Sequence, residues 1–252
     1  MNDTAVRVQD IPSITHREGI ELAATEYRRF GDVVHQLGPD DWERPTVCDQ
    51  WDVRGLVAHN VGAVEANSSL REQAHQMRAG RRIAKDKGYG HWIDGVTELQ
   101  VRERAAAGPD ELVARWDAAW PRALKSRRRF PPFLRPLPLD FGPLLGKRPM
   151  GSYLIDVVLT RDVWMHRIDL CRAVGLVPVL TADHDGRLLA DMVVDWQRVH
   201  GHGFRLELEG PAGGSYAAGI DGEVLRIDGL EWIWILSGRG TGSGLLKKEL
   251  PL

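Results

Sequence analysis

Helical spacing of apolar residues governs the first two-thirds of the chain and limits its fold more than any other feature. Over 17–37 the apolar residues recur every three or four positions, and the pattern stops at a Gly-Pro pair. A second helix is expected over 52–80 with Asp52 as its N-cap, and weaker helical segments over 91–107 and 109–128. These amphipathic segments predict a mainly α protein built on a helical bundle.

Prolines are concentrated in residues 130–149, which hold six of the fourteen in the chain. This density is incompatible with a continuous helix or an inner strand, so the segment is expected to form a loop. Its many apolar residues are compatible with a flap over a pocket or with simple packing. A strongly apolar helix is expected next, over 151–173, with Gly175 as its stop signal.

The pattern changes after residue 175. A helical segment over 183–199 leads into three short stretches with strand-like alternation, separated by Gly-rich turns, and a short apolar helix follows them. We therefore predict two domains, a helical bundle at 1–175 and a small α+β domain at 176–252.

Charge and hydropathy argue against nucleic acids and membranes as binding partners. The 252 residues carry a formal net charge of −2, so no overall basic field exists to hold nucleic acid or an anionic membrane surface. No uninterrupted apolar run approaches the roughly 18 residues of a membrane span, and the start of the sequence lacks the pattern of a signal peptide. We expect a cytoplasmic protein that binds neither nucleic acid nor membrane.

The two cysteines indicate neither a disulfide framework nor a thiolate zinc site. Cys48 and Cys171 are far apart and form no C-x-x-C pair. If the protein binds a metal, its ligands must be histidines and carboxylates.

A polar trio interrupts the apolar face of the helix expected over 151–173. Asp162, His166 and Asp169 share one stripe with Ile155 and other apolar residues. Buried carboxylates are normally paired, protonated or bound to a metal. Asp162 and His166, at i and i+4, can converge on one metal ion, although the same spacing also suits a simple ion pair.

A histidine occupies the apolar stripe of the second helix. His59 lies among small residues, with Gly55 and Gly62 nearby, which leaves room around its imidazole. By itself it fits a core histidine bonded to a backbone carbonyl better than it fits a metal ligand.

Two longer segments resemble a known family. "LGPDDWERPTVCDQWDVRGLVAHNVG" and "TRDVWMHRIDLCRAVG" are similar to the mycothiol-dependent maleylpyruvate isomerase-like branch of the DinB superfamily. The Trp, Pro-Thr-x-Cys, Trp-x-Val-Arg, Leu-Val-Ala-His and His-Arg-x-Asp-Leu elements occur in order. The C-terminal "WILSGRGTGSGLL" resembles the end of the sterol-carrier-like second domain of that family.

The resemblance implies a DinB-like four-helix bundle that holds one divalent metal, usually zinc, through His59, Asp162 and His166. Three protein ligands leave a coordination position for water or for the thiol of mycothiol. The family carboxylate is commonly glutamate, so Asp162, one methylene shorter, implies a tighter, weaker or differently tuned site.

Two further residues are candidates for supporting roles. Asp169 lies one turn beyond His166 and could accept an N–H from its imidazole, or could make a structural bond to a neighbouring helix. Relatives that isomerise maleylpyruvate use an arginine near the C-terminus to hold substrate carboxylates, and Arg239 is the nearest candidate here. An arginine in such a Gly-rich turn is also compatible with an ordinary loop residue.

The first hypothesis for function is a metal- and mycothiol-dependent isomerase or S-transferase. A metal-bound thiolate would attack an electrophilic small molecule, whose identity the sequence leaves open. The alternatives are a metal-dependent hydrolase on the same scaffold and a non-catalytic protein that binds a small molecule or a metal. A monomer or a homodimer is expected.

Overall fold

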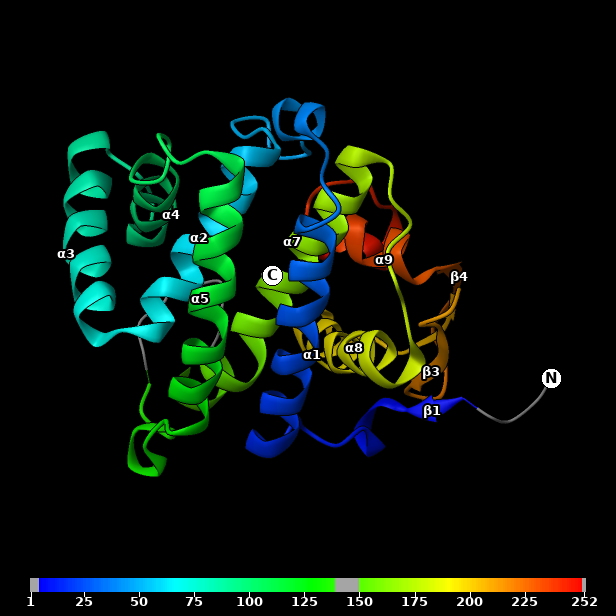
Figure 1. The fold of residues 1–252 in the computed structure, drawn as a ribbon. Helices are drawn as coiled ribbons and strands as arrows, with labels where there is room; N and C mark the ends of the chain where they lie inside the picture. The colour runs from blue at the N-terminus through cyan, green and yellow to red at the C-terminus, as the bar shows by residue number, and fades with distance from the viewer. Residues whose placement is uncertain (1–4, 139–149, 251–252) are drawn as a thin grey trace. The chain divides into compact units, whose positions relative to one another are not determined.

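The computed structural model describes residues 5–138 and 150–250. The chain divides into two compact units, which we call the helical unit (His16–Pro178) and the sheet unit (Met1–Thr15 with Val179–Leu252). Figure 1 shows the helices and strands of both. The two units match the fold class predicted from the sequence, a helical bundle followed by a small α+β domain.

Four helices of the helical unit form a bundle. α1 packs against α5 and α7, and α2 closes the ring by contacting the same two helices (Figure 1). The core is apolar and aromatic; Phe30 and Trp116 pack with their ring centroids 4.4 Å apart. The four helices are α1 (His16–Val34), α2 (Val53–Ser68), α5 (Pro109–Arg128) and α7 (Leu159–Val174).

Two more helices, α3 (Leu70–Lys87) and α4 (Trp92–Arg102), pack against each other and against α2. The prediction of one continuous helix over 52–80 was wrong, because the backbone is extended at Ser69. The hydroxyl of Ser69 accepts a hydrogen bond from the backbone N–H of Glu72 and so caps α3.

A π-helical turn, Leu154–Val158, separates the short α6 (Met150–Tyr153) from α7, where a continuous helix was predicted. The buried guanidinium of Arg127 donates to the carbonyl of Ile155 inside this turn and to Thr160 Oγ1. Irregular buried backbone is stabilised when such carbonyl groups find donors. Gly175, with φ of 75°, ends α7 as predicted.

The sheet unit holds four strands in the order β1-β3-β2-β4. β2 and β3 are antiparallel, and the outer pairs β1–β3 and β2–β4 are parallel. β1 places residues 5–15 in this unit, although they were predicted to belong to the bundle; two residues are too few for a period-2 pattern. The strands are β1 (Val6–Arg7), β2 (Phe204–Glu209), β3 (Gly214–Ala218) and β4 (Glu223–Asp228).

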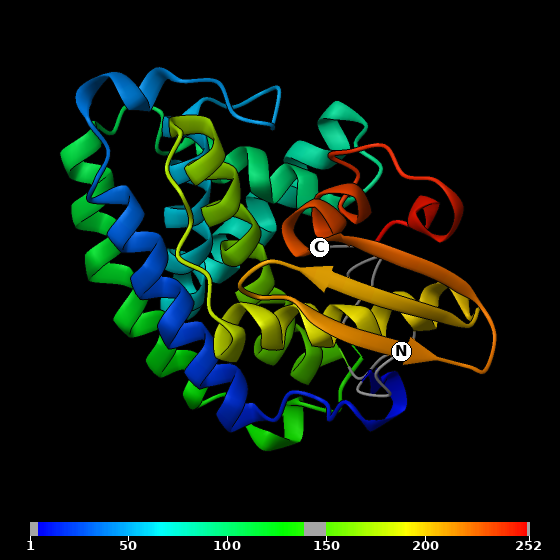
Figure 2. The ribbon, with the colours of Figure 1, turned by 90° about the vertical axis from the view of Figure 1, so that its right-hand side faces the viewer.

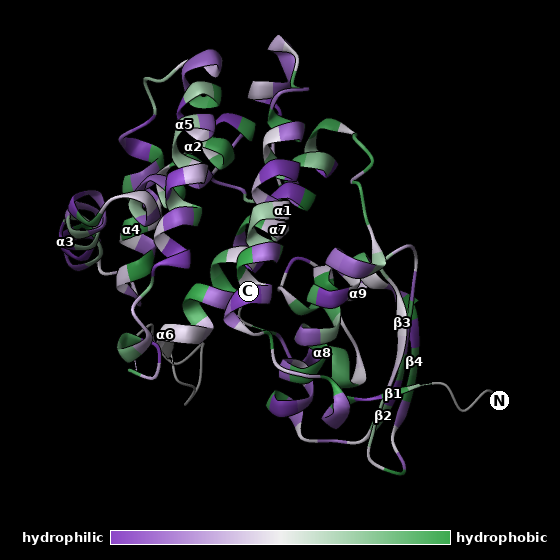
Figure 3. Ribbon diagram, turned by 60° about the horizontal axis from the view of Figure 1, so that its bottom comes forward, coloured by the Kyte–Doolittle hydropathy of each residue, from purple (hydrophilic) through white to green (hydrophobic). Residues whose placement is uncertain are grey.

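Helices α8 (Arg187–His200) and α9 (Gly229–Leu236) lie on the same face of this sheet (Figures 2 and 3). Side chains of β2 alternate between buried and exposed, as expected for a sheet covered on one face. Beneath them Trp196 and Trp232 meet edge to face, with ring centroids 5.6 Å apart. Among the described residues, no helix is long and apolar enough to cross a membrane.

Candidate metal centre

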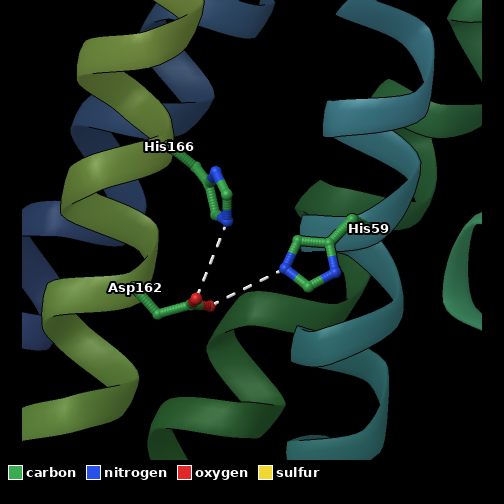
Figure 4. A group of neighbouring side chains, drawn as sticks. All are labelled: His59, Asp162 and His166. Carbon is green, nitrogen blue, oxygen red and sulfur yellow. Dashed lines mark ion pairs between the residues drawn. The ribbon is translucent and has the colours of Figure 1, made fainter. Parts of the chain in front are cut away.

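Three of the residues singled out in the sequence converge inside the helical unit. His59 projects from α2 toward Asp162 and His166, which stand one turn apart on α7 (Figure 4). His59 Nε2 lies 3.9 Å from Asp162 Oδ2, and His166 Nε2 lies 3.7 Å from Asp162 Oδ1. One potential ligand atom from each residue lies within 4.8 Å of the others.

Burial keeps the imidazole of His59 in the neutral form that a metal ligand requires. Its side chain is 8% exposed, and burial together with the neighbouring His166 lowers its pKa from 6.5 to about 4, against the opposing effect of Asp162. The imidazole is therefore neutral at neutral pH and has a lone pair available for a metal.

The three side chains fit a divalent cation. Separations of 3.7 and 3.9 Å are too long for hydrogen bonds. Ligands held about 2.0 to 2.2 Å from a tetrahedral zinc ion lie roughly 3.3 to 3.6 Å apart, so small side-chain rotations bring these atoms onto one ion. Two imidazoles with one carboxylate are a known donor set for catalytic zinc.

The Asp162 side chain is 33% exposed, whereas His166 is 10% exposed. A fourth ligand can therefore approach the cluster from the side of the carboxylate. Three protein ligands with one accessible position are typical of a catalytic rather than a structural zinc site.

Asp169 lies behind His166, as its spacing suggested. Its Oδ2 is 3.4 Å from His166 Nδ1, the ring nitrogen that faces away from Asp162, and its side chain is fully buried. A carboxylate at this position can orient a ligating imidazole, but His166 Nδ1 makes no hydrogen bond within the described residues, and the assignment stays a prediction.

Arg239, the other candidate, belongs to the sheet unit. It lies in the loop after α9, half-buried, and its backbone N–H donates to the carbonyl of Trp234. Its role in holding a substrate carboxylate also stays a prediction.

The contact between Trp51 and the cluster was not predicted from the sequence. The indole stacks on the imidazole of His59, and its ring centroid lies 6.3 Å from that of His166. The loop that carries it is fixed by Thr46, whose hydroxyl donates to the carbonyl of Trp51 over 2.8 Å. The Trp-x-Val-Arg element contained the signal, but spacing alone does not show that this side chain folds back over α2.

A buried ion pair holds α7 against α1. Arg167 donates to both carboxylate oxygens of Glu26, over 2.6 and 3.3 Å, and both side chains are almost fully buried. Because Arg167 follows His166 directly, this pair fixes the helix turn that presents His166 to the cluster.

The family to which the chain belongs follows from a match to a known domain. Residues 23–171, which include all three members of the cluster, match the model of the mycothiol maleylpyruvate isomerase N-terminal domain. The chain belongs to this family. The resemblance seen in the sequence is thereby confirmed.

Solved structures of the family share the fold. The crystal structure of a mycothiol-dependent maleylpyruvate isomerase is 16% identical, with 94% of each chain covered and a TM-score of 0.60. A mutant form of a mycothiol-dependent maleylpyruvate isomerase gives a TM-score of 0.58 at 16% identity, over 94% of this chain and 93% of that one. A comparison with curated protein sequences gives no match.

Proposed function

We propose that this chain is a mycothiol-dependent isomerase or S-transferase that acts on an electrophilic small molecule and requires a divalent metal, with zinc as the expected ion. The convergence of His59, Asp162 and His166 in a bundle of this family carries the proposal.

Four residues of the chain would bind the metal or orient one of its ligands. His59 and His166 would bind the metal through Nε2, and Asp162 would bind it through its carboxylate. A bound divalent ion would lower the pKa of a coordinated thiol and so supply a thiolate at neutral pH. Asp169 would keep the proton of His166 on Nδ1, leaving Nε2 free for the ion.

The position of Asp162 also limits where the cosubstrate can bind. Its exposed edge is the open side of the cluster, so the thiol of mycothiol and the electrophile are expected to approach there. Arg239 is the proposed partner of a substrate carboxylate, because a planar guanidinium binds a carboxylate through two hydrogen bonds.

Metal analysis followed by activity assays tests the proposal. The purified protein should contain about one equivalent of metal, and Asp162→Ala and His166→Ala should lose it. Turnover of maleylpyruvate or another electrophile should require added mycothiol. His75→Ala is the matched control, because His75 is exposed and pairs with Glu103 on the surface of the same unit.

Other results would overturn the proposal in distinct ways. Full metal content in both cluster variants would reject the ligand assignment. Metal-dependent turnover without a thiol would indicate a hydrolase, and bound metal without turnover would indicate a binding protein.

A further inference from the structure

Gln100, on α4, lies in the interior beside α2 and His59. It is 5% exposed. Gly62 permits this contact, since a Cβ atom at that position would lie 2.7 Å from both Cβ and Cγ of Gln100. Any larger residue would push α4 away from the helix that carries His59.

A chain of amides fixes the orientation of the Gln100 side chain. Gln76 Nε2 donates to the Gly62 carbonyl over 3.0 Å and to Glu72 Oε1 over 2.8 Å, which leaves Gln76 Oε1 to accept. Gln100 Nε2 donates to that oxygen over 2.9 Å. The carbonyl oxygen of Gln100 is therefore the end of its amide that remains for another partner.

Two buried polar atoms in this region lack hydrogen-bond partners. Within residues 5–138 and 150–250, Gln100 Oε1 and His59 Nδ1 are both buried, and neither makes a hydrogen bond. Leaving either atom unsatisfied would cost about 1 to 3 kcal/mol. Burial lowers the pKa of His59 most, and the side chain of Gln100 is among the neighbours that oppose this shift, so the two side chains lie close enough to interact.

We propose that Gln100 is a positioning residue, whose Oε1 accepts the Nδ1–H of His59 and so fixes the imidazole in the tautomer with a lone pair on Nε2. Nε2 is the nitrogen that faces Asp162. The chain Glu72–Gln76–Gln100 thus sets which nitrogen of His59 can bind a metal. The consequence for metal binding rests on the proposed function, whereas the tautomer exists without metal.

Nitrogen-15 NMR of the metal-free protein, labelled at histidine, tests the tautomer directly. At mildly alkaline pH, where the imidazole is neutral, His59 should carry its proton on Nδ1. Gln100→Leu should abolish this preference, and Gln100→Glu, which keeps an acceptor oxygen, should retain it. An Nε2-protonated His59 in the wild type, or an unchanged tautomer in Gln100→Leu, would overturn the inference.

Further variants show whether a change in the tautomer is specific to Gln100 or follows from any mutation in this region. Gln76→Leu leaves Gln100 intact but frees its amide to rotate, so a partial loss of the preference is expected. Asn67→Ala is the matched control, because it removes another α2 amide, which donates to the Ala63 carbonyl of its own helix. A loss of the preference in Asn67→Ala would contradict the specific role of Gln100.

Zinc affinity then tests the consequence. Gln100→Leu should bind zinc about 10- to 100-fold more weakly than the wild type, the usual effect of removing a partner of a metal ligand, and Gln100→Glu should remain within a few-fold. Equal affinities in Gln100→Leu and the wild type would overturn the positioning role. A wild type that binds no zinc would reject the proposed function but leave the tautomer result intact.

Discussion

The indole of Trp51 lies over the imidazole of His59, with ring centroids 5.0 Å apart and ring planes at 25°. The stack covers one face of the imidazole and limits its rotation. Trp51 thereby links the loop before α2 to the geometry of the cluster.

Replacing Trp51 should weaken metal binding without abolishing it. Stacking contributes about 0.5 to 1.5 kcal/mol, so Trp51→Leu should lower zinc affinity roughly 2- to 12-fold, and Trp51→Phe should lower it less. Competition titration with a chromogenic chelator measures the change. Trp92→Leu is the control, because Trp92 also packs on a histidine, His91, outside the cluster; an equal loss there would contradict a specific role for Trp51.

Gly62→Ala should destabilise the helical unit although alanine favours helices. Helix propensity alone predicts a gain of about 1 kcal/mol. The added Cβ would meet Gln100 at 2.7 Å, and overpacking of this kind costs about 1 to 3 kcal/mol, so the net effect should be a loss. Urea denaturation checks the sign. Gly90→Ala, where a Cβ would meet nothing within 4 Å, should change stability little; a more stable Gly62→Ala would refute the close contact.

The buried Glu26–Arg167 pair should be costly to break. Arg167→Met leaves the carboxylate of Glu26 without this counter-charge in the interior, and we expect a loss of about 3 to 5 kcal/mol in the free energy of unfolding. The double variant Glu26→Leu/Arg167→Met should recover most of that loss. Arg17→Met, which breaks the exposed pair with Glu21, should cost no more than about 0.5 kcal/mol. Equal losses in Arg167→Met and Arg17→Met would contradict this interpretation.

Glu65 should make stability depend on pH in the acid range. Burial acts to raise its pKa, but hydrogen bonds from Arg115 and Arg104 outweigh this and hold the pKa below the usual 4.5. The folded state therefore binds the proton more weakly than the unfolded state. The contribution of Glu65 is complete above pH 4.5 and is lost as the pH falls through the lowered pKa.

Urea denaturation between neutral pH and the acid range measures this effect. The free energy of unfolding of the wild type should fall more steeply below pH 4.5 than that of Glu65→Gln. Glu21→Gln, at an exposed i, i+4 pair, should follow the wild type. Identical slopes for Glu65→Gln and the wild type would show that the two arginines do not hold this carboxylate.

Periodicity predicted most of the fold because long amphipathic helices and alternating strands carry strong local signals. The break at Ser69 was missed because the apolar spacing runs through it, although the serine and Glu72 form a recognisable capping pattern. The π-helical turn before α7 depends on Arg127, which lies outside that segment. No local pattern could reveal it.

Only part of the candidate site could be predicted from the sequence. Asp162 and His166 were linked by helical spacing, whereas His59 lies about a hundred residues earlier and was joined to them through the family resemblance. Gln100 carried no signal, because a buried glutamine in an amphipathic helix looks like any other polar residue until the contact between α4 and α2 is known.

Zinc K-edge X-ray absorption of the protein, before and after mycothiol is added, tests the central claim most directly. We predict two imidazole nitrogens and one carboxylate oxygen at about 2.0 to 2.2 Å, and one new sulfur at about 2.3 Å when the thiol binds. The nitrogen shell should lose one imidazole in His59→Ala. A protein that retains no zinc, or a zinc shell that gains no sulfur from mycothiol, would contradict the account.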